Sequence, residues 1–421
     1  MNILILGGGG REHALAWAVK QNPKCDALFC APGNAGIAKI ATCFDLDIND
    51  GAAVVDAARA HAIDFLIIGP EAPLAAGVAD DLRAAGILTF GPSAAAAKLE
   101  ASKAFTKEIC DACGAPTARY ARFDALPLAK AYVEKMGAPI VIKADGLAAG
   151  KGVIVAMTLQ EAMAGLDEIF GGAFGAAGTE VVIEEFMEGE EASLFVLCDG
   201  TNALPFGTAQ DHKRAFDGDA GPNTGGMGAY SPAPVLSGAV LDAAMTTIVR
   251  PTLAEMARRG TPYEGVLYVG LMITDGKPRL VEYNVRFGDP ECQVLMVRLG
   301  GQALDALQAA AEKRLGRHTT HWADDHAMTV VMAAKGYPGP YTKGSEIRGL
   351  DALQQTSHQM VFHAGTTAEG NKVLASGGRV LNITARGTTL TEARDTAYAL
   401  IDQIDWDDGF NRSDIGWRAL D

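Results

Sequence analysis

A short apolar run that ends in a lysine and opens into a glycine-rich loop is the clearest place for chemistry in this sequence. Residues 140–142 (IVI) predict a buried strand, and Lys143 stands at its end, where side chains of an α/β sheet reach a ligand. In the loop that follows, glycines such as Gly150 let backbone N–H groups approach an anion, and Lys151 adds a positive charge. Asp145 occupies the first glycine position of the P-loop pattern, so the loop differs from that motif. We predict a polyphosphate site, and an ordinary hairpin turn is the alternative.

A row of polar side chains is expected on the strand near residues 279–291. Glu282, Asn284 and Arg286 alternate with apolar residues and therefore share one face of that strand. Glu282 and Asn284 are hard oxygen donors about 6–7 Å apart, suited to magnesium ions on nucleotide phosphates. Arg286 can bind a carboxylate or phosphate through two parallel hydrogen bonds. A solvated polar face is the alternative.

The strand expected at residues 181–183 leads into a polar stretch suited to a nucleoside. It continues into Glu184, Glu185 and Phe186, where a strand leaving its sheet offers a free N–H and C=O to the edge of a purine. Glu191 follows a few residues later, and its carboxylate can hold ribose hydroxyls. An exposed acidic turn is the alternative.

The densest polar run of the chain spans residues 209–234 and has neither strand nor helix periodicity. Its charged and polar residues include Asp211, His212, Lys213, Arg214, Asp217 and Asp219. A long loop of this kind in a compact enzyme usually carries function, and disorder is the alternative.

Length and charge limit the kind of protein that these residues serve. At 421 residues the chain is long enough for about three domains. Its hydrophobic content of 48% and its 49 glycines are typical of a compact α/β enzyme with many tight turns. The net charge of −15 argues against nucleic acid or a membrane as partner and favours a small anionic substrate in a local basic pocket. The N-terminal run resembles neither a signal peptide nor a membrane span, and seven scattered cysteines indicate free thiols, so we expect a cytoplasmic protein.

The first twenty residues predict a strand, a glycine-rich turn and a helix, which together open a doubly wound α/β domain. The dinucleotide pattern G-x-G-x-x-G fails in either register, because Glu12 or His13 stands at its third glycine. An anion site at a helix N-terminus remains. Its candidate residues are Gly8, Gly9, Gly10 and Arg11. Glu71 follows the apolar strand at residues 65–68 in a similar loop, where its carboxylate can accept hydrogen bonds from sugar hydroxyls or simply lie at the surface.

Apolar periodicity and glycine-rich connections divide the chain into three expected domains. These are residues 1–100, 101–326 and 327–421. Residues 119–186 alternate short strands and helices and predict a small lid. A helix beginning near Ser102 leads toward the lid, and by pattern alone its Lys103 and Lys107 belong to a solvated helix face.

Two further groupings of residues could bind metal or have a purely structural role. Cys110 and Cys113 have the CxxC spacing, but no second CxxC completes four ligands, and a helix is expected there. His318, His321 and His326 cluster in a polar stretch, where a solvated connection between domains is the favoured alternative to a metal site.

Several stretches spread over the whole chain form a characteristic set. They are GGGGREHALA, GPEAPL, IKADGLAAGKGV, EEFMEGEEAS, QDHKRAFDGDAGPNTGGMGAYSP, GVLYVGLM, NVRFGDPE and SDIGWRAL. The set resembles the glycinamide ribonucleotide synthetases, a family of ATP-grasp enzymes in purine biosynthesis. The resemblance implies an α/β protein of the ATP-grasp fold, with a Rossmann-like N-terminal domain, a lid subdomain and a C-terminal α/β domain.

The resemblance also implies a reaction in which glycine, ATP and 5-phosphoribosylamine give glycinamide ribonucleotide, ADP and phosphate through glycyl phosphate. Catalysis then consists mostly of alignment and charge neutralisation. The implied ligands are nucleotide phosphates for Lys103, Lys143, Gly150 and Lys151, adenine for Glu184, Glu185 and Phe186, ribose for Glu191, magnesium or manganese for Glu282 and Asn284, and phosphoribosylamine for Gly8, Gly9, Gly10, Arg11 and Glu71. Arg286, Asp211 and Lys213 are the expected catalytic residues. We expect a monomer or a weak homo-oligomer.

Three other functions stay open. A sister ATP-grasp ligase that uses formate or carboxylates its substrate would share the nucleotide site but not the QDHKR motif. A nicotinamide oxidoreductase needs the intact dinucleotide pattern, which is missing. A noncatalytic nucleotide-binding module is disfavoured by the row of Glu282 and Asn284.

Overall fold

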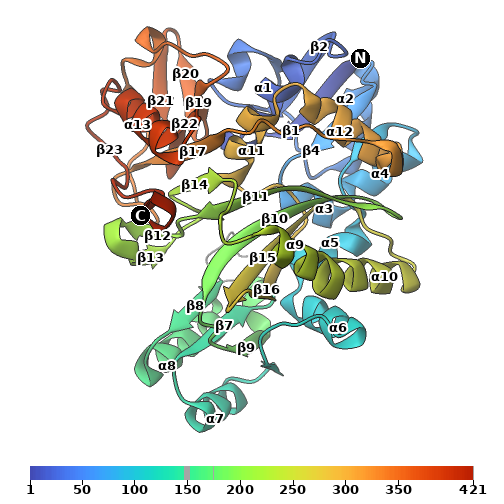
Figure 1. Ribbon diagram of the computed structural model, residues 1–421, viewed down its shortest axis with the longest axis vertical. Coiled ribbons are helices and arrows are strands. Elements are labelled where there is room, and N and C mark those ends of the chain that lie inside the picture. Colours follow the sequence, from blue (N-terminus) through green and yellow to red (C-terminus); the bar gives the residue numbers. More distant parts are fainter. Residues whose placement is uncertain (147–151, 174, 421) are drawn as a thin grey trace.

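The computed structural model describes residues 1–146, 152–173 and 175–420 as a mixed α/β protein (Figure 1). The N-terminal lobe, drawn in blue, and the C-terminal lobe, drawn in red, lie at one end of the long axis, and a small green and teal lobe projects at the other end. Long strands run between them. This arrangement brings residues from distant parts of the chain around one central region.

The N-terminal lobe is built on a parallel sheet with the strand order β3-β2-β1-β4-β5. Its strands are β1 (Asn2–Gly7), β2 (Ala27–Pro32), β3 (Thr42–Cys43), β4 (Phe65–Ile68) and β5 (Leu88–Phe90). Its helices are α1 (Gly10–Lys20), α2 (Gly51–Ala60), α3 (Glu71–Ala76), α4 (Val78–Ala84) and α5 (Ala94–Ala101). Both faces of β1 are buried, which explains its continuous apolar sequence. The strand order reverses between β1 and β4, so the segments after these two strands, where α1 and α3 begin, border one crevice.

The projecting lobe is the predicted lid, an antiparallel sheet with the order β6-β9-β7-β8. Its elements are β6 (Tyr120–Phe123), α7 (Leu126–Met136), β7 (Ile140–Ala144), β8 (Val153–Ala156), α8 (Leu159–Glu168) and β9 (Val181–Glu185). Ile142 and Ile183 pack with Val133 and Leu166 in a core of their own. The Thr158 hydroxyl caps α8 by accepting a hydrogen bond from the Glu161 N–H at 3.2 Å. The lid therefore has its own apolar core beneath β7, the strand that carries Lys143.

A long sheet joins the centre of the molecule to the C-terminal lobe in the order β16-β15-β10-β11-β14-β17-β22-β19, with β23 on β17. Its strands are β10 (Glu190–Asp199), β11 (Ala203–Asp211), β14 (Gly228–Ser231), β15 (Glu264–Thr274), β16 (Lys277–Asn284), β17 (His326–Ala334), β19 (Gln359–His363), β22 (Arg379–Gly387) and β23 (Gly409–Phe410). Tyr230 of β14 pairs with Met328 of β17, so the sheet continues from the central region into the C-terminal lobe without a break.

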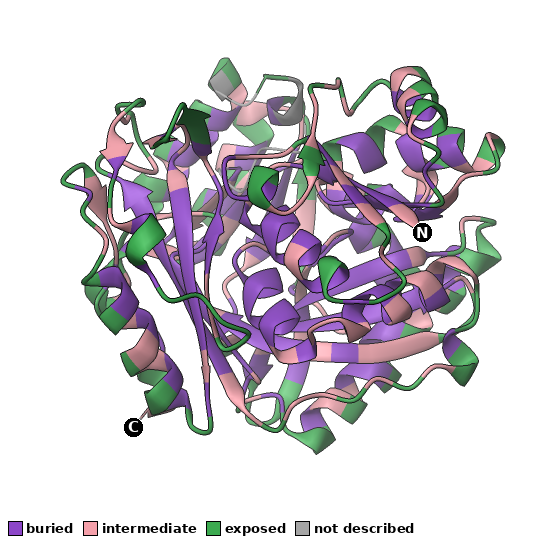
Figure 2. Cartoon of the chain, turned by 90° about the horizontal axis from the view of Figure 1, so that it is seen from above, coloured by how far each residue is buried: buried purple, intermediate pink, exposed green. Residues whose placement is uncertain are grey.

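The remaining helices cover these sheets, and two small sheets complete the fold. The helices are α6 (Lys103–Cys113), α9 (Gly238–Ala244), α10 (Arg250–Arg258), α11 (Glu291–Leu299), α12 (Gln302–Ala311), α13 (Leu390–Ile401) and α14 (Trp417–Leu420). The small-sheet strands are β12 (Arg214–Phe216), β13 (Ala220–Asn223), β18 (Glu346–Ile347), β20 (Thr366–Glu369) and β21 (Lys372–Ala375). Seen from above, buried residues follow the strands and inner helix faces, and exposed residues collect on loops and outer helices (Figure 2). Among the described residues, no helix is long and apolar enough to cross a bilayer.

The prediction that residues 209–234 lack regular structure was wrong in part. The run contains the end of β11, the β12–β13 hairpin and strand β14. Its strands are short, and β14 finds its hydrogen-bonding partners in β11 and β17. Pairing with distant strands therefore supplies order that the local polar sequence does not signal.

The C-terminal strap, which we define as residues 410–418, folds against the β12–β13 hairpin. The buried Arg412 guanidinium lies 3.0 Å from the Asp219 carboxylate at the tip of the hairpin. The Gly416 N–H donates to His212 Nε2 at 2.9 Å, at the base of the hairpin. The strap thus fixes a short hairpin that has little apolar core of its own.

Candidate active site

A cavity of about 830 Å³ is bordered by residues from the N-terminal lobe, the lid, the central sheet and the C-terminal lobe. The predicted residues in its walls are Arg11, Glu71, Lys103, Lys143, Glu184, Glu185, Phe186, Glu191, Asp211, Lys213, Glu282, Asn284 and Arg286. Gly8, Gly9 and Gly10 are not among its described lining residues. Gly150 and Lys151 lie outside the described residues. The volume suits a nucleotide together with small substrates.

Lys107, Lys143 and Glu184 form a buried group at the lid side of the cavity, which we call the lysine cluster. The Lys143 ammonium lies 2.9 Å from Glu184 Oε2, and the Lys107 ammonium lies 3.0 Å from Glu184 Oε1. Each of the three side chains is only 3% exposed. The prediction of a solvated Lys107 was wrong, because α6 turns this side chain toward the lid strand β9. Glu184, expected beside adenine, has its carboxylate between the two ammonium groups.

Lys103 begins α6 and has neutral partners. Its ammonium donates to the carbonyl oxygens of Glu100 at 3.3 Å and Gly146 at 3.1 Å. The Ser102 hydroxyl caps the helix by accepting from the Phe105 N–H at 3.0 Å, which fixes where Lys103 leaves the chain. Because carbonyl groups do not neutralise an ammonium charge, Lys103 can still attract an anion.

Glu185 ends β9 and is held by two arginines. The Arg119 Nε lies 2.6 Å from Glu185 Oε2, and Arg279 also pairs with this carboxylate. Burial works to raise the pKa of Glu185, but hydrogen bonds from Arg279 and Arg119 outweigh it and lower the pKa to about 2. Phe186, Met187 and Glu188 follow and line the cavity. The last two were not predicted, and their position directly after the predicted strand was the available signal.

Glu191 on β10 and Lys213 just after β11 form an ion pair across the cavity wall. Burial tends to lower the pKa of Lys213, but the carboxylates of Glu191, Asp211 and Glu282 raise it above its ordinary value overall. Burial raises the pKa of Asp211 to about 7, although Lys213 opposes the shift. Lys213 therefore keeps its charge, whereas Asp211 exchanges a proton near neutral pH.

Glu282 and Asn284 of the expected polar row lie on β16, whereas Arg286 lies just beyond this strand, which ends at Asn284. Arg286 Nη2 donates to the Asn284 side-chain oxygen at 3.2 Å, and Glu282 lines the same cavity. Burial tends to raise the pKa of Glu282, but Lys213 and Lys143 hold it below its ordinary value, so the carboxylate is charged, as a metal ligand must be. In the part of the chain that the structure describes, no group of three or more His, Cys, Asp or Glu side chains is arranged to hold a metal. A cation here would need further oxygens from a bound ligand.

Glu71, Glu100 and Arg286 form a second charged group, in which Glu100 is buried and the other two side chains are partly buried; we call it the arginine cluster. Arg286 Nε lies 3.1 Å from Glu71 Oε2, and Arg286 Nη2 lies 3.0 Å from Glu100 Oε1. Burial raises the pKa of Glu100 despite the guanidinium, whereas Arg286 and Arg11 overcome burial and lower the pKa of Glu71. Glu100 was not predicted, because nothing near the end of α5 signals a partner almost two hundred residues away.

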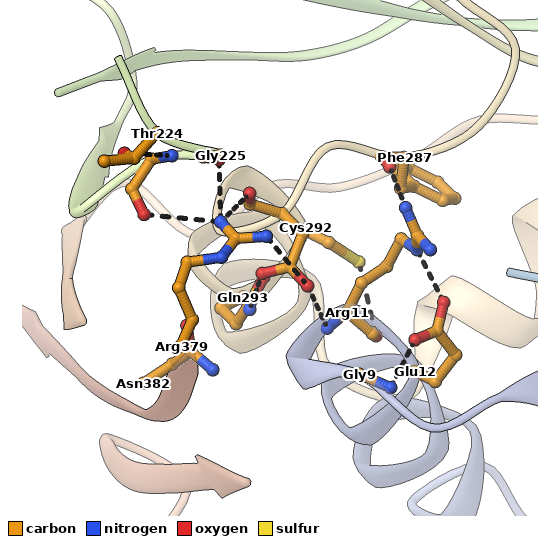
Figure 3. A network of polar contacts seen from close by, with 12 residues as sticks. Gly9, Arg11, Glu12, Thr224, Gly225, Phe287, Cys292, Gln293, Arg379 and Asn382 are labelled. Carbon is orange, nitrogen blue, oxygen red and sulfur yellow. Dashed lines mark hydrogen bonds and ion pairs between the residues drawn. The ribbon is translucent and has the colours of Figure 1, made fainter. Parts of the chain in front are cut away.

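Two amide groups at the glycine-rich turn and the start of α1 donate to carboxylates (Figure 3). The Gly9 N–H donates to Glu12 Oε2 at 2.7 Å, and the Arg11 N–H donates to Asp289 Oδ2 at 3.5 Å. The Arg11 guanidinium points away from the turn and donates to the Phe287 carbonyl at 3.1 Å. Of the four residues predicted here, Arg11 reaches the cavity wall.

Close packing explains two of the glycines. A Cβ atom on Gly8 would lie 2.4 Å from the Gly33 carbonyl oxygen, and one on Gly10 would lie 2.2 Å from the Asn382 side-chain nitrogen. Neither distance is compatible with a larger residue. Contact between the N-terminal turn and its neighbours therefore requires glycine at both positions.

Arg379, the first residue of β22, lines the cavity from the C-terminal lobe. Its Nη1 donates to the Gly225 carbonyl at 2.7 Å, at the end of the segment that follows the β12–β13 hairpin (Figure 3). The guanidinium also lies 3.8 Å from Asp289. Arg379 thus joins the C-terminal lobe to the same wall as the N-terminal turn.

The cysteine and histidine groupings have structural surroundings. Cys110 is buried, and burial raises the pKa of its thiol to about 12. The Cys113 thiol lies 3.8 Å from the Cys110 carbonyl oxygen. His318 contacts the Thr320 hydroxyl at 3.2 Å, and His326 starts β17. These surroundings agree with the favoured structural alternative.

Three family models match this chain in succession. The phosphoribosylglycinamide synthetase N domain matches residues 1–100, the ATP-grasp (A) domain of the same synthetase matches residues 101–292, and its C domain matches residues 327–418. Together they span most of the sequence.

Curated relatives and solved structures agree with these matches. A phosphoribosylamine–glycine ligase of Mesorhizobium japonicum is 59% identical, with 100% of this chain and 99% of the relative covered. The chloroplastic ligase of Arabidopsis thaliana is 55% identical over 97% of this chain and 79% of its own length. The crystal structure of the Thermotoga maritima ligase has a TM-score of 0.85 at 31% identity, covering 98% of this chain and 100% of that one. A biotin carboxylase of Campylobacter jejuni shares the fold at 14% identity, with a TM-score of 0.75 and coverage of 97% and 92%. The expected ATP-grasp fold is thereby confirmed.

Proposed function

The chain belongs to the phosphoribosylglycinamide synthetase family, whose members use ATP to ligate glycine to 5-phosphoribosylamine in purine biosynthesis. We propose that this reaction takes place in the cavity described above. The observation that carries the proposal is that thirteen described residues expected at the site border one cavity. They come from separate elements that only the fold brings together.

We assign the nucleotide to the lid side of the cavity. Lys103 and Lys143 bind its phosphates, since both are cations in the wall and the carbonyl groups to which Lys103 donates do not neutralise its charge. Gly150 and Lys151 belong to the same phosphate loop by sequence. The segment of Glu184, Glu185 and Phe186 borders adenine, and because both carboxylates are already paired, its backbone groups are the ones available for the base. Glu191 holds the ribose.

Glu282 and Asn284 fit a divalent cation, because one supplies a charged carboxylate and the other an amide oxygen on the same strand. Magnesium or manganese would be held there together with nucleotide phosphates. Bound at this position, the ion supplies positive charge to the transferring phosphoryl group.

The second half of the cavity receives glycine and phosphoribosylamine. The glycine carboxylate attacks the γ-phosphorus of ATP, and ADP leaves. The amine of phosphoribosylamine then attacks the carbonyl carbon of glycyl phosphate, and inorganic phosphate leaves. Lys213 and Arg286 stabilise the negative charge that develops, and Asp211, with its pKa near 7, is suited to take the proton that the amine loses. Glu71, Arg11 and the turn of Gly8, Gly9 and Gly10 border phosphoribosylamine.

We further propose that residues 1–100, 101–326 and 327–421 act as the phosphoribosylamine-binding, ATP-grasp and C-terminal domains, with residues 119–186 as the lid. A cytoplasmic enzyme that is a monomer or a weak homo-oligomer is consistent with the acidic composition. The relative in Arabidopsis is described as chloroplastic.

Substrate dependence of ADP release tests the proposed function. Purified protein should release ADP only when glycine and phosphoribosylamine are both present, because the site needs an acceptor carboxylate and an amine. Formate and bicarbonate in place of glycine serve as controls. Equal ADP release with either control would contradict the assignment and favour a sister ligase.

A further inference from the structure

The lysine cluster contains a cation that the proposed chemistry does not use. Lys143 and Glu184 line the cavity, whereas Lys107 is not one of its described lining residues. The Lys107 ammonium lies 3.0 Å from Glu184 Oε1 and donates to the Thr117 hydroxyl at 2.8 Å and the Ala118 carbonyl at 3.2 Å. Helix α6 therefore presents a positive charge to the side of the carboxylate that faces the protein.

Two lysines share one carboxylate in this cluster, so within ion-pair distance the described residues carry one more positive than negative charge. In the described part of the chain, Glu184 provides the only carboxylate oxygens within 4 Å of either ammonium. Glu282 is farther away and belongs to the expected metal site. A buried charge without a partner is costly, so the cluster favours an anion on its open side, where Lys143 borders the cavity.

The consequence of Lys107 becomes clear when its charge is removed. Glu184 and Lys143 would then form a neutral one-to-one pair, and a phosphate would have to compete with a buried carboxylate for the Lys143 ammonium. With Lys107 present, Glu184 keeps a partner when Lys143 binds an anion. Lys143 also donates to the Val281 carbonyl at 3.0 Å, and this neutral group does not offset its charge.

We propose that Lys107 is a positioning residue that neutralises Glu184 from behind the cavity and so leaves Lys143 available to a phosphate of the nucleotide. This proposal rests on the assignment of the nucleotide to the lid side. Lys107 acts through Glu184 and does not itself touch the nucleotide.

Substitution of Lys107 by methionine, which has a similar length and no charge, tests the proposal. Lys107→Met should raise the KM for ATP and the Kd for ADP with magnesium at least about tenfold, while kcat and the KM for glycine change less than about threefold. The matched control is Lys130→Met, which removes another paired lysine of the lid region, 2.6 Å from Asp167 and away from the cavity lining. An ATP KM and ADP Kd within twofold of the native protein would overturn the proposal.

A second variant separates this role from simple support of the fold. When Glu184→Gln removes the carboxylate, Lys107 has nothing left to neutralise, so adding Lys107→Met should change the ADP Kd less than about threefold. A residue needed only for folding would cause the same loss in both backgrounds, and that result would overturn the proposal. If Lys107→Met alone does not fold, the comparison of Glu184→Gln with the double variant still decides the question.

Lys143→Met distinguishes this proposal from the nucleotide assignment beneath it. An unchanged ADP Kd in Lys143→Met would contradict the nucleotide site and with it the role of Lys107. A large loss in Lys143→Met together with native affinity in Lys107→Met would overturn the role of Lys107 alone. Calorimetric titration with ADP and magnesium measures all of these affinities without turnover.

Discussion

The lysine cluster and the arginine cluster both border the same cavity. Cations outnumber carboxylates in the lysine cluster, and carboxylates outnumber the cation in the arginine cluster. In the first, two lysines share Glu184, and in the second, two glutamates share Arg286. The two also differ in geometry. Lysine offers a compact charge that can turn to a new partner, whereas the planar guanidinium of Arg286 is already held by Glu71, Glu100 and Asn284.

This difference is consistent with the proposed division of the cavity between the nucleotide and the amine substrate. A surplus of positive charge suits the phosphates of a nucleotide. Two glutamates on one arginine suit an amine, and the nearby Arg11 offsets part of the charge of Glu71. Burial also lowers the pKa of Lys107 and raises the pKa of Glu100, which are the two ways in which a buried charge is relieved when no ligand is present. Each cluster is therefore complementary to a ligand of the opposite sign.

Removing the cavity-facing lysine should have the largest effect. Lys143→Met takes away the surplus cation itself, so we expect kcat/KM for ATP to fall at least about 100-fold, about 2.7 kcal/mol in the barrier. Steady-state ADP release at varied ATP measures it. A fall of less than threefold would show that the surplus charge of the lysine cluster has no part in catalysis.

Substitution of the two oxygen donors on β16 should have the second largest effect. Glu282→Gln and Asn284→Leu should each lower turnover at least about tenfold, roughly 1.4 kcal/mol, because each removes an oxygen from the expected cation site. Turnover is measured across a magnesium titration. Native turnover at saturating magnesium would mean that this face of β16 is merely solvated.

Asp211 lies in the same cavity, and its charge should change near neutral pH. With a pKa of about 7, its charged form increases about tenfold between pH 6 and 8, and kcat/KM for phosphoribosylamine should rise accordingly. Because the folded pKa lies above the ordinary value of 3.8, the folded protein binds the extra proton, and this group's contribution to stability should decline as pH rises from about 4 to 7. Asp211→Asn should remove both dependences. A pH–rate profile that the substitution leaves unchanged would contradict this assignment.

Removing one carboxylate from the arginine cluster should have a smaller effect, which we expect mainly on the KM for phosphoribosylamine. Glu71→Gln leaves one glutamate on Arg286, and because Glu71 is partly exposed, we expect the KM for phosphoribosylamine to rise only about fivefold, or about 1 kcal/mol. The KM for ATP should stay within twofold. Equal increases in both constants would break the proposed division of the cavity into two sides.

The smallest effect is expected for an ion pair of the same chemistry outside the cavity. Lys130 and Asp167 are 33% and 56% exposed, so Lys130→Met should change the free energy of unfolding by less than about 0.5 kcal/mol. Denaturant titration measures this change. If Lys130→Met lowered the free energy of unfolding as much as Lys107→Met, the exposed Lys130–Asp167 pair and the buried Lys107–Glu184 pair would not differ in the way that their burial predicts.

The sequence was sufficient for elements whose local pattern matches their burial. The strand at Phe65–Ile68 has the predicted bounds, and the lid contains the strands and helices expected in their order. The alternation around Glu282 and Asn284 also gave the correct shared face, because side chains of a strand alternate whatever the strand packs against.

Other features depend on partners that are distant in the chain. Lys107 looks like a surface lysine until Glu184 is brought to it, and Glu100 looks like the end of an ordinary helix until Arg286 is brought beside it. The strand at Gly228–Ser231 is ordered through β11 and β17. The local sequence around each of these residues has no pattern that indicates its distant partner. These contacts could therefore be identified only from the folded structure.

The C-terminal strap also links the cavity to the order in which the chain is synthesised. The β12–β13 hairpin forms part of the cavity wall and is held by residues about 200 positions later in the chain. The Gly218 N–H donates to the Asp414 carboxylate, and the Gly416 N–H donates to His212 at the base of the hairpin. At roughly 5–20 residues per second, a ribosome needs about 10–40 s to travel from one to the other. Throughout that interval the nascent chain carries the hairpin without its fastening, so we expect a competent site only after the strap has emerged from the ribosome.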